Sequence, residues 1–199
     1  TLITDISQLG TASLFEGGAT PEADLLRLVG SGIVVADGDD TILGPNQSVS
    51  ALFGAEGNDT INSQASGDSL FGGNGQFNAP DGNDFLTNNT GLAVLYGDAG
   101  NDTINAERSS TISGGVGSDY IFTEENSNLI YGDRPAGLGG DNSLGGNDTI
   151  ILGADTRSGG DDSVVGGFGN DYIRAGADEP SFLFGNQGVV GSLGRRAFV

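Results

Sequence analysis

The chain has 199 residues, a formal net charge of −20 and 37 glycines, while hydrophobic residues make up only 36%. This charge argues against binding to nucleic acid or an anionic lipid surface, because both would repel the chain, and it favours cations as partners. Cys, His, Met and Trp are absent. Disulfides, soft-metal sites and every catalytic scheme that depends on histidine are therefore excluded.

The first 30 residues are expected to form a capping segment ahead of the repeats. In the stretch TPEADLLRLVG, Thr20 precedes Pro21 and Gly30 ends the apolar run. A Thr N-cap, a Pro at the first helical position and a terminal Gly are typical of a short helix. An additional edge strand over the same residues is the alternative. The longest apolar stretch, LLRLVGSGIVVA, is much shorter than the ~20 residues of a bilayer span, so we expect no membrane span.

Residues 31–193 repeat a short motif of Asp, any residue, then Ile or Leu. Its aspartates are Asp40, Asp59, Asp84, Asp102, Asp119, Asp148 and Asp171. A weaker series lies between them, with an aliphatic residue two places after Ser50, Asp68, Ala93, Ser110, Asn128, Asp162 and Ser181. Apolar peaks thus recur about every nine residues from Ile33 to Leu193, which predicts strands of two or three residues with one inward side chain each. Such fixed-period similarity is typical of a solenoid.

Four of the strong half-repeats share a glycine-rich prelude: LFGAEGNDTI, LYGDAGNDTI, ISGGVGSDYI and VVGGFGNDYI. They match the pattern Gly-Gly-x-Gly-x-Asp-x-apolar-x, so residues 36–190 resemble the haemolysin-type, or repeats-in-toxin (RTX), calcium-binding family. The resemblance implies an all-β fold, a parallel β-roll with short terminal capping segments. Two nonapeptides would form one coil, strands would stack into two facing sheets, and calcium would lie in the turns between successive coils. Ile121 and Ile130 would then point inward from opposite sheets of one coil.

The strict turns fall on alternate half-repeats and therefore on one edge of the roll, which we call the Gly-Asp edge. The other edge, with turns such as NAERSST and TEENSN, is called the opposite edge. We expect several Ca²⁺ ions, mainly along the Gly-Asp edge. The expected metal ligands are Asp40, Gly54, Gly57, Asp59, Gly82, Asp84, Gly97, Gly100, Asp102, Gly114, Gly117, Asp119, Asp148, Gly166, Gly169 and Asp171.

On the opposite edge we interpret Asp68 and Asp162 as solvated turn side chains, with calcium ligation as the alternative. We expect replacement of Asn128 to do little. Two insertions, NGQFNAPD and DRPAGLGGDNSLGG, interrupt preludes of the Gly-Asp edge near residues 74–82 and 133–146. We expect both to bulge out there as loops.

Calcium is the cation that this donor set favours. It takes six to eight oxygens at about 2.3–2.6 Å, whereas Mg²⁺ demands octahedral geometry at about 2.1 Å. Gly turns supply carbonyl oxygens, because Gly adopts positive φ without a Cβ penalty. Without metal, aspartates on coils ~5 Å apart would repel by roughly 3 kcal/mol per neighbouring pair at an effective dielectric of about 20. Metal-binding free energy would thus become folding free energy.

We expect a secreted or cell-surface protein with a structural, adhesive or self-assembling role, and not an enzyme, because His, Cys and a G-x-S-x-G elbow are absent. The resemblance implies a chain that stays unfolded at low cytosolic calcium, passes through a type I secretion channel and folds outside. The alternative is a calcium-binding secretion or folding module of a larger secreted enzyme or toxin. Ice binding is disfavoured, because Glu56, Ala99, Val116 and Phe168 fill the place where a rank of Thr would stand.

The last residues, 194–199, are interpreted as a C-terminal tail. The stretch SFLFGNQGVVGSLGRRAFV is rich in apolar residues and carries Arg195 and Arg196, while the N-terminal portion is acidic. Such ends favour head-to-tail contacts between copies, which would give a homo-oligomer, a filament or a surface layer. A tail that folds back and caps its own roll is one alternative, and an unreleased secretion signal of the family is another.

Overall fold

The computed structural model consists of β-strands and turns. It describes residues 2–6, 13–15, 25–28, 33–35, 38–74, 81–125, 127–134, 145–153, 161–174, 182–185 and 189–190. No helix occurs within these ranges, and so none of the described segments is a helix long and apolar enough to cross a bilayer.

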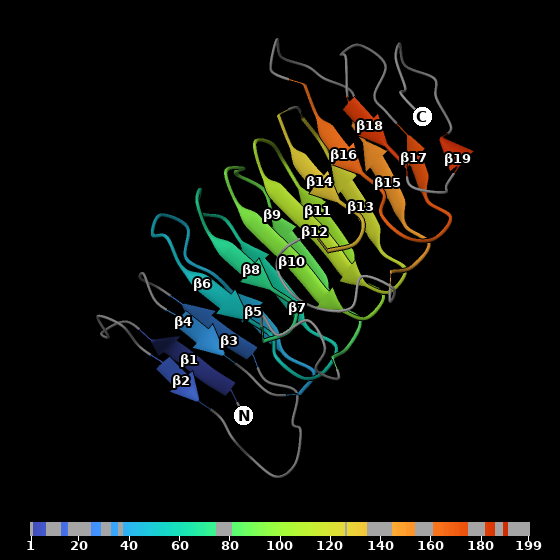
Figure 1. The fold of residues 1–199 in the computed structure, drawn as a ribbon. Helices are drawn as coiled ribbons and strands as arrows, with labels where there is room; N and C mark the ends of the chain where they lie inside the picture. The colour runs from blue at the N-terminus through green and yellow to red at the C-terminus, as the bar shows by residue number, and fades with distance from the viewer. Residues whose placement is uncertain are drawn as a thin grey trace.

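The strands form two parallel sheets, whose long stack is shown in Figure 1. Sheet A has ten strands: β1 (Leu2–Ile6), β3 (Leu25–Leu28), β5 (Thr41–Leu43), β7 (Thr60–Ser63), β9 (Phe85–Asn88), β11 (Thr103–Ala106), β13 (Tyr120–Thr123), β15 (Thr149–Leu152), β17 (Tyr172–Arg174) and β19 (Val189–Val190). Sheet B has nine: β2 (Ser13–Phe15), β4 (Ile33–Val35), β6 (Ala51–Phe53), β8 (Ser69–Phe71), β10 (Val94–Ala99), β12 (Thr111–Val116), β14 (Leu129–Tyr131), β16 (Ser163–Val165) and β18 (Phe182–Phe184).

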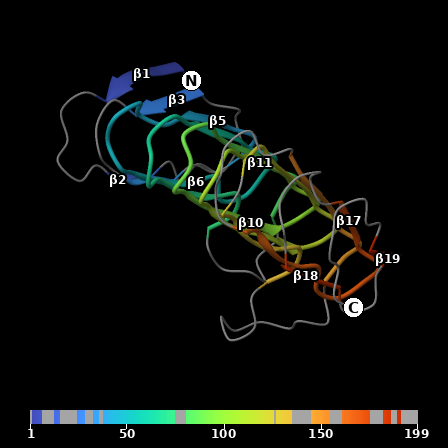
Figure 2. The same cartoon turned by 90° about the horizontal axis from the view of Figure 1, so that it is seen from above.

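Consecutive strands lie in opposite sheets, and each strand pairs in parallel with the strand two places further along the chain. Two strands and two turns therefore make one coil, and successive coils stack along one axis. Figure 2 shows the rounded turns that join the sheets. This arrangement confirms the parallel β-roll. The turns from sheet B to sheet A form the Gly-Asp edge, and those from sheet A to sheet B form the opposite edge.

Two columns of aliphatic side chains, one from each sheet, form the core. They run in register with one residue per strand: Ile42, Ile61, Leu86, Ile104, Ile121, Ile150 and Ile173 from sheet A, and Leu52, Leu70, Leu95, Ile112, Ile130 and Val164 from sheet B. All are at most 1% exposed and belong to one cluster. Ile121 and Ile130 lie on opposite sheets of one coil, as predicted.

The N-terminal segment differs from the helix that its capping residues favour. Leu25–Leu28 form strand β3, which pairs with β1 on one side and β5 on the other. The helix is therefore wrong and the strand alternative is confirmed, because pairing with a preformed sheet outweighs weak local capping signals. Strands β1 to β3 belong to the same two sheets as the repeats, so a capping role for residues 1–30 stays a prediction.

Strand lengths also differ from the expected two or three residues. Several strands have four, and β10 and β12 have six, because pairing continues into the glycine prelude at Asp98↔Gly115 and Ala99↔Val116. Most of both expected insertions, residues 75–80 and 135–144, lies outside the described residues, as do Leu193 and the tail 194–199. The flanks of both insertions, Asn74 with Asp81 and Arg134 with Gly145, stand between sheet B and sheet A strands.

Replacing Ile121 tests the thin core. Ile121→Ala should lower the free energy of unfolding by about 2–5 kcal/mol, because it removes a fully buried side chain whose coil contributes one residue from each sheet. The measurement is urea unfolding in saturating calcium. Tyr120→Thr on the same strand is the control, since Tyr120 is 45% exposed. Equal losses in the two variants would contradict this core.

Candidate metal sites between the coils

A ladder of buried aspartates runs along the Gly-Asp edge. From Asp59 onward, the Oδ1 atom of each aspartate accepts a hydrogen bond from the backbone N–H of the aspartate one coil earlier. The donor–acceptor pairs are Asp40 to Asp59, Asp59 to Asp84, Asp84 to Asp102 and Asp102 to Asp119 at 2.8 Å, Asp119 to Asp148 at 2.9 Å, and Asp148 to Asp171 at 3.1 Å. All of them are between 1% and 3% exposed. The seven predicted aspartates thus occupy equivalent positions, one per coil.

In the ladder aspartates from Asp59 onward, the second carboxylate oxygen has no hydrogen-bond partner. Oδ2 is buried without a hydrogen bond in Asp59, Asp84, Asp102, Asp119, Asp148 and Asp171. A buried carboxylate oxygen without a partner is costly. Along the described part of this edge, six such oxygens therefore form a row of unused acceptors.

A glycine lies against each of these oxygens. A Cβ atom added to Gly97 would overlap Asp102 Oδ2 and the carbonyl oxygen of Gly114 on the next coil. The same overlap of a carboxylate oxygen with the next coil's glycine carbonyl occurs at Gly54, Gly72, Gly114 and Gly132, and at Gly166 the carboxylate overlaps alone. Carboxylate and carbonyl oxygens thus converge where a side chain would stand. An oxygen-only donor set of this kind fits a hard cation such as Ca²⁺.

A second row of glycines sets the close approach of the coils. A Cβ at Gly100 would overlap the carbonyl oxygen of Gly82, and its φ of 137° lies in the left-handed region. Each of the following would likewise overlap the glycine one coil earlier: Gly57, Gly82, Gly117, Gly146 and Gly169. Any larger residue would separate the turns whose oxygens must meet.

All predicted ligand residues lie on this edge, and the structure adds four glycines that sequence reasoning missed. Gly72 and Gly132 belong to the first glycine row, and Gly38 and Gly146 to the second. An insertion separates Gly72 from Asp84 and Gly132 from Asp148, so the nonapeptide pattern is broken in the sequence. The sequence signal for Gly72 and Gly132 is a Gly directly after the strand, in SLFG and LIYG, as in LFG and LYG of intact repeats.

The residue before each aspartate forms a second ladder, which was also missed. Asn58 Oδ1 accepts from the backbone N–H of Asn83 at 2.9 Å, and Asn83 Oδ1 accepts from that of Asn101 at 2.7 Å. Ser118, Asn147 and Asn170 continue the series. These bonds run from the later coil to the earlier one, opposite to the aspartate ladder. The Asn-Asp dipeptide therefore ties each coil to both neighbours.

Burial raises the pKa of the ladder carboxyls. Their pKa values are raised to about 8 for Asp59, about 9 for Asp119 and about 7 for Asp84, Asp102 and Asp148, and the pKa of Asp171 is also raised. Loss of hydration is the largest cause in each. Neighbouring carboxylates add to it at every one of them except Asp171, and the backbone hydrogen bond opposes it. Loss of hydration therefore raises these pKa values more than any single neighbouring carboxylate does.

Further carboxylates lie beside the ladder. Burial raises the pKa of Asp81 to about 7 and of Asp133 to about 6. Asp133 accepts hydrogen bonds from the backbone N–H groups of Gly146, at 3.2 Å, and Phe168. Asp98 is 1% exposed and has a φ of 73°. Within the described ranges, no three acidic side chains converge as a metal-binding group, so backbone carbonyls must supply much of any coordination shell.

The buried aspartates of the opposite edge accept hydrogen bonds from protein donors. Asp68 and Asp162 are 0% and 3% exposed, so their interpretation as solvated side chains is wrong. Asp68 accepts from the backbone N–H of Ser50 at 2.7 Å and from Ser63 Oγ, and burial raises its pKa to about 6. Asp162 Oδ1 accepts from the backbone N–H of Asn128 at 2.8 Å. These carboxylates became buried because the coils stack on this edge too.

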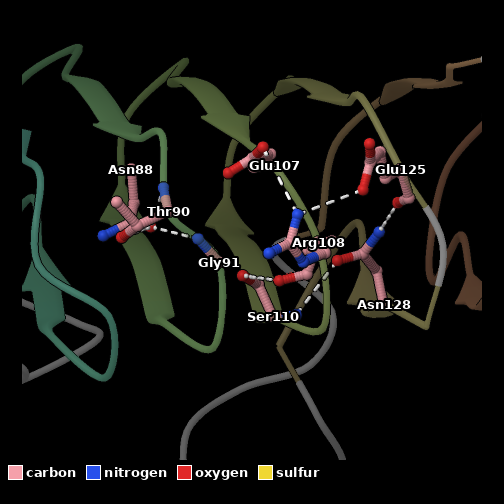
Figure 3. Close-up of polar contacts among 8 residues, drawn as sticks. All are labelled: Asn88, Thr90, Gly91, Glu107, Arg108, Ser110, Glu125 and Asn128. Atoms are coloured by element: carbon pink, nitrogen blue, oxygen red, sulfur yellow. Dashed lines mark hydrogen bonds and ion pairs between the residues drawn. The ribbon is translucent and has the colours of Figure 1, made fainter.

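Asparagine and arginine side chains complete the opposite edge, as Figure 3 shows. Asn88 Oδ1 accepts from the backbone N–H groups of Thr90 at 3.1 Å and Gly91 at 2.9 Å. Arg108 Nη1 lies 3.2 Å from Glu125 Oε2 and 3.5 Å from Glu107 Oε1. The Asn88 side-chain oxygen thus accepts from the backbone of its own turn, while the Arg108 guanidinium pairs with two glutamates.

Comparison with protein families gives one match, the RTX calcium-binding nonapeptide repeat. Four copies match, at residues 51–76, 81–109, 106–134 and 157–179, which together cover more than half of the chain. The chain therefore belongs to the RTX calcium-binding repeat family, whose repeats are structural calcium-binding units rather than a catalytic fold. Comparisons with curated proteins and with solved structures found no match.

Asp119 and Asn128 provide a matched pair across the two edges. Asp119→Asn keeps an oxygen for the N–H of Asp102 but replaces the unpartnered Oδ2 by an amide, so it should reduce the number of bound calcium ions. Asn128→Ala should keep the wild-type number. Its buried amide serves Ser110 and Asp162, so we expect about 1–3 kcal/mol loss of folding stability rather than the negligible effect predicted from sequence. Native mass spectrometry in calcium measures the ion count. Fewer ions in Asn128→Ala, with an unchanged count in Asp119→Asn, would contradict the assignment.

The raised carboxyl pKa values predict an opposite pH response with and without metal. Without metal, folding favours the protonated form of the ladder carboxyls, because their pKa values are higher in the folded state. The stability that these carboxyls contribute is fully present below the ordinary pKa of 3.8 and is lost as pH rises through about 7 to 9. Calcium must displace these protons, so its affinity should rise over the same range. Circular dichroism of decalcified protein between pH 5 and 9, with calcium titrations at each pH, checks both. A metal-free β signal that grows with pH would refute the ladder's protonation.

Proposed function

We propose that this protein is a secreted calcium-dependent β-roll that folds when it reaches calcium outside the cell and then serves as a structural or adhesive surface element. The observation that carries the proposal is the row of buried, unpartnered Oδ2 atoms beside glycine carbonyls on the Gly-Asp edge. A bound Ca²⁺ would supply positive charge and oxygen coordination to these groups. The candidate ligands are the ladder aspartates, with the glycine carbonyls of both rows.

The coupling of calcium to folding follows from the balance between core and edge. Each coil buries one large aliphatic residue from each sheet, a small gain for a chain that must order many glycines. Each coil also buries a carboxylate whose charged form is disfavoured. The metal-free chain is therefore poorly stabilised at neutral pH, and metal binding adds what the core lacks.

Export and a surface role rest on membership of the family and on this coupling. A chain that folds only in millimolar calcium would stay unfolded in a low-calcium cytosol and fold after export. The alternative role, as a folding module of a larger secreted enzyme or toxin, uses the same edge and the same metal. Intact mass measurement of the natural product distinguishes the two roles.

We further propose that copies of the chain assemble head to tail. Within the described strands, sheet A ends on β1 and β19, and sheet B ends on β2 and β18, each of which pairs on one side only. Sheet edges of this kind are templates for pairing with another chain. These edges lie at the two ends of the stack, so head-to-tail contact would lengthen it into a filament or layer.

A calcium titration followed by far-UV circular dichroism tests the folding mechanism. Decalcified protein at neutral pH should be largely disordered, and calcium should restore the β signal cooperatively, because each occupied turn orders its neighbours. Magnesium should substitute poorly, since its shorter bonds and octahedral geometry do not suit a shell of backbone carbonyls. A full β spectrum in verified metal-free protein at neutral pH would overturn the proposal.

A further inference from the structure

Three exposed aromatic side chains lie in one column on the outer face of sheet A. Phe85 is 44% exposed, and Tyr120 and Tyr172 are each 45% exposed. They occupy the first position of β9, β13 and β17, beside core residues that point to the other face. Thr103 and Thr149 stand between them in the same column, since pairing joins Phe85, Thr103, Tyr120, Thr149 and Tyr172 in order.

The spacing of these rings is regular. Adjacent strands lie about 4.8 Å apart, so aromatics on every second strand stand about 9.6 Å apart. The pairing from β9 to β17 has no register shift at these positions, and Figure 1 shows the strands stacked along the long axis of the molecule. The three rings therefore form an evenly spaced row along the roll.

The same face is almost without charge, although the chain carries −20. From β5 to β17 the aromatic column contains Thr41, Thr60, Phe85, Thr103, Tyr120, Thr149 and Tyr172, and the neighbouring column contains Leu43, Asn62, Thr87, Asn105, Phe122, Ile151 and Arg174. Of these side chains only Thr87, which is 7% exposed, is buried. Arg174 is the single charged residue in these described positions. The two columns contain no carboxylate, so a ligand on this face would not have to strip water from one. A neutral ligand would also not be repelled by the charge of the chain.

The aromatic residues of sheet B are arranged differently. Phe53, Phe71 and Tyr96 occupy consecutive strands and stack on one another, with ring centroids 4.5 and 5.5 Å apart. Their faces are used within the protein. On sheet A a Thr separates each ring from the next, so the separated rings can each accept a flat apolar group from outside.

We propose that the outer face of sheet A binds a neutral, extended β-1,4-linked polysaccharide such as a glucan or chitin. A pyranose ring presents apolar C–H groups on its faces and hydroxyls around its rim, so it can stack on an aromatic ring and bond to polar neighbours. The disaccharide repeat of such a chain is close to two strand spacings. Alternate sugars would meet Phe85, Tyr120 and Tyr172, while Thr103, Thr149 and Asn105 receive rim hydroxyls. The inference rests on the proposed surface role and names its ligand class.

The alternative ligands fit this face less well. A protein partner is anchored by a contiguous, fully desolvated apolar centre, whereas Thr interrupts every aromatic of this row. A polyanion would be repelled by the field of the chain. The row spans β9 to β17 and thus several sugars, which suits a polymer better than a free monosaccharide.

Binding of calcium-loaded full-length protein to microcrystalline cellulose and to chitin beads tests the proposal. The wild type should be retained on at least one of them, and Tyr120→Thr should bind about tenfold more weakly, because it removes the middle ring of three. Thr suits a strand and already occupies the neighbouring positions. Tyr131→Thr on the outer face of sheet B is the matched control and should bind like the wild type. Soluble carboxymethyl cellulose, the anionic form of the glucan, should compete less well than neutral hydroxyethyl cellulose.

Circular dichroism of each variant in calcium separates loss of the face from loss of the fold. A native β spectrum without retention of the wild type on either polymer overturns the polysaccharide site and leaves the calcium-dependent fold standing. Equal weakening by Tyr120→Thr and Tyr131→Thr also overturns it. A wild type that stays disordered in calcium refutes the proposed function, and this inference with it.

Discussion

The structure depends on how the buried carboxylates of one edge are satisfied. One oxygen of each ladder aspartate from Asp59 onward accepts a hydrogen bond from a backbone N–H of the preceding coil. This bond fixes the stacking of coils along the edge. The other oxygen is left without a partner beside a glycine carbonyl of the next coil. That oxygen can be protonated or can coordinate a hard cation. Which of the two occurs sets the stability of the roll at neutral pH.

The two edges solve one geometric problem with different chemistry. Both must bring turns close enough for parallel strands to pair, and both place a side-chain oxygen under the backbone N–H of the preceding coil. On the opposite edge Ser63, Asn128 and Arg108 supply the remaining partners from within the chain. On the Gly-Asp edge glycine removes the side chains that could have done so. The first solution gives the buried aspartates protein donors, whereas the second leaves carboxylate oxygens that suit a hard cation.

The repeat and its core could be predicted from sequence because they are periodic. One Ile or Leu per strand, two places after Asp102 or Asp119, identifies the inward positions, and the glycine prelude identifies the edge. Contacts between coils join residues of different repeats and leave no pattern within one repeat. The hydrogen bond between Asn58 and Asn83 and the burial of Asp68 were therefore seen only in the structure. Gly72 and Gly132 were not predicted as site residues, because insertions separate them from their aspartates. At β3 the sequence left a helix and a strand as alternatives, because four residues are too few for a periodic pattern to outweigh the capping residues.

The aspartate ladder also explains why function is expected on the faces of the roll. The described outward positions of sheet A from β5 to β17 carry no acidic side chain, so this face remains available for contact. The central claim is that calcium lies in a single row, between successive coils of the Gly-Asp edge. A crystal structure grown in calcium, with an anomalous difference map collected at long wavelength, tests it most directly. The account predicts a line of peaks between the ladder aspartates and the glycine carbonyls, whereas peaks confined to the opposite edge, or none at the ladder, would contradict it.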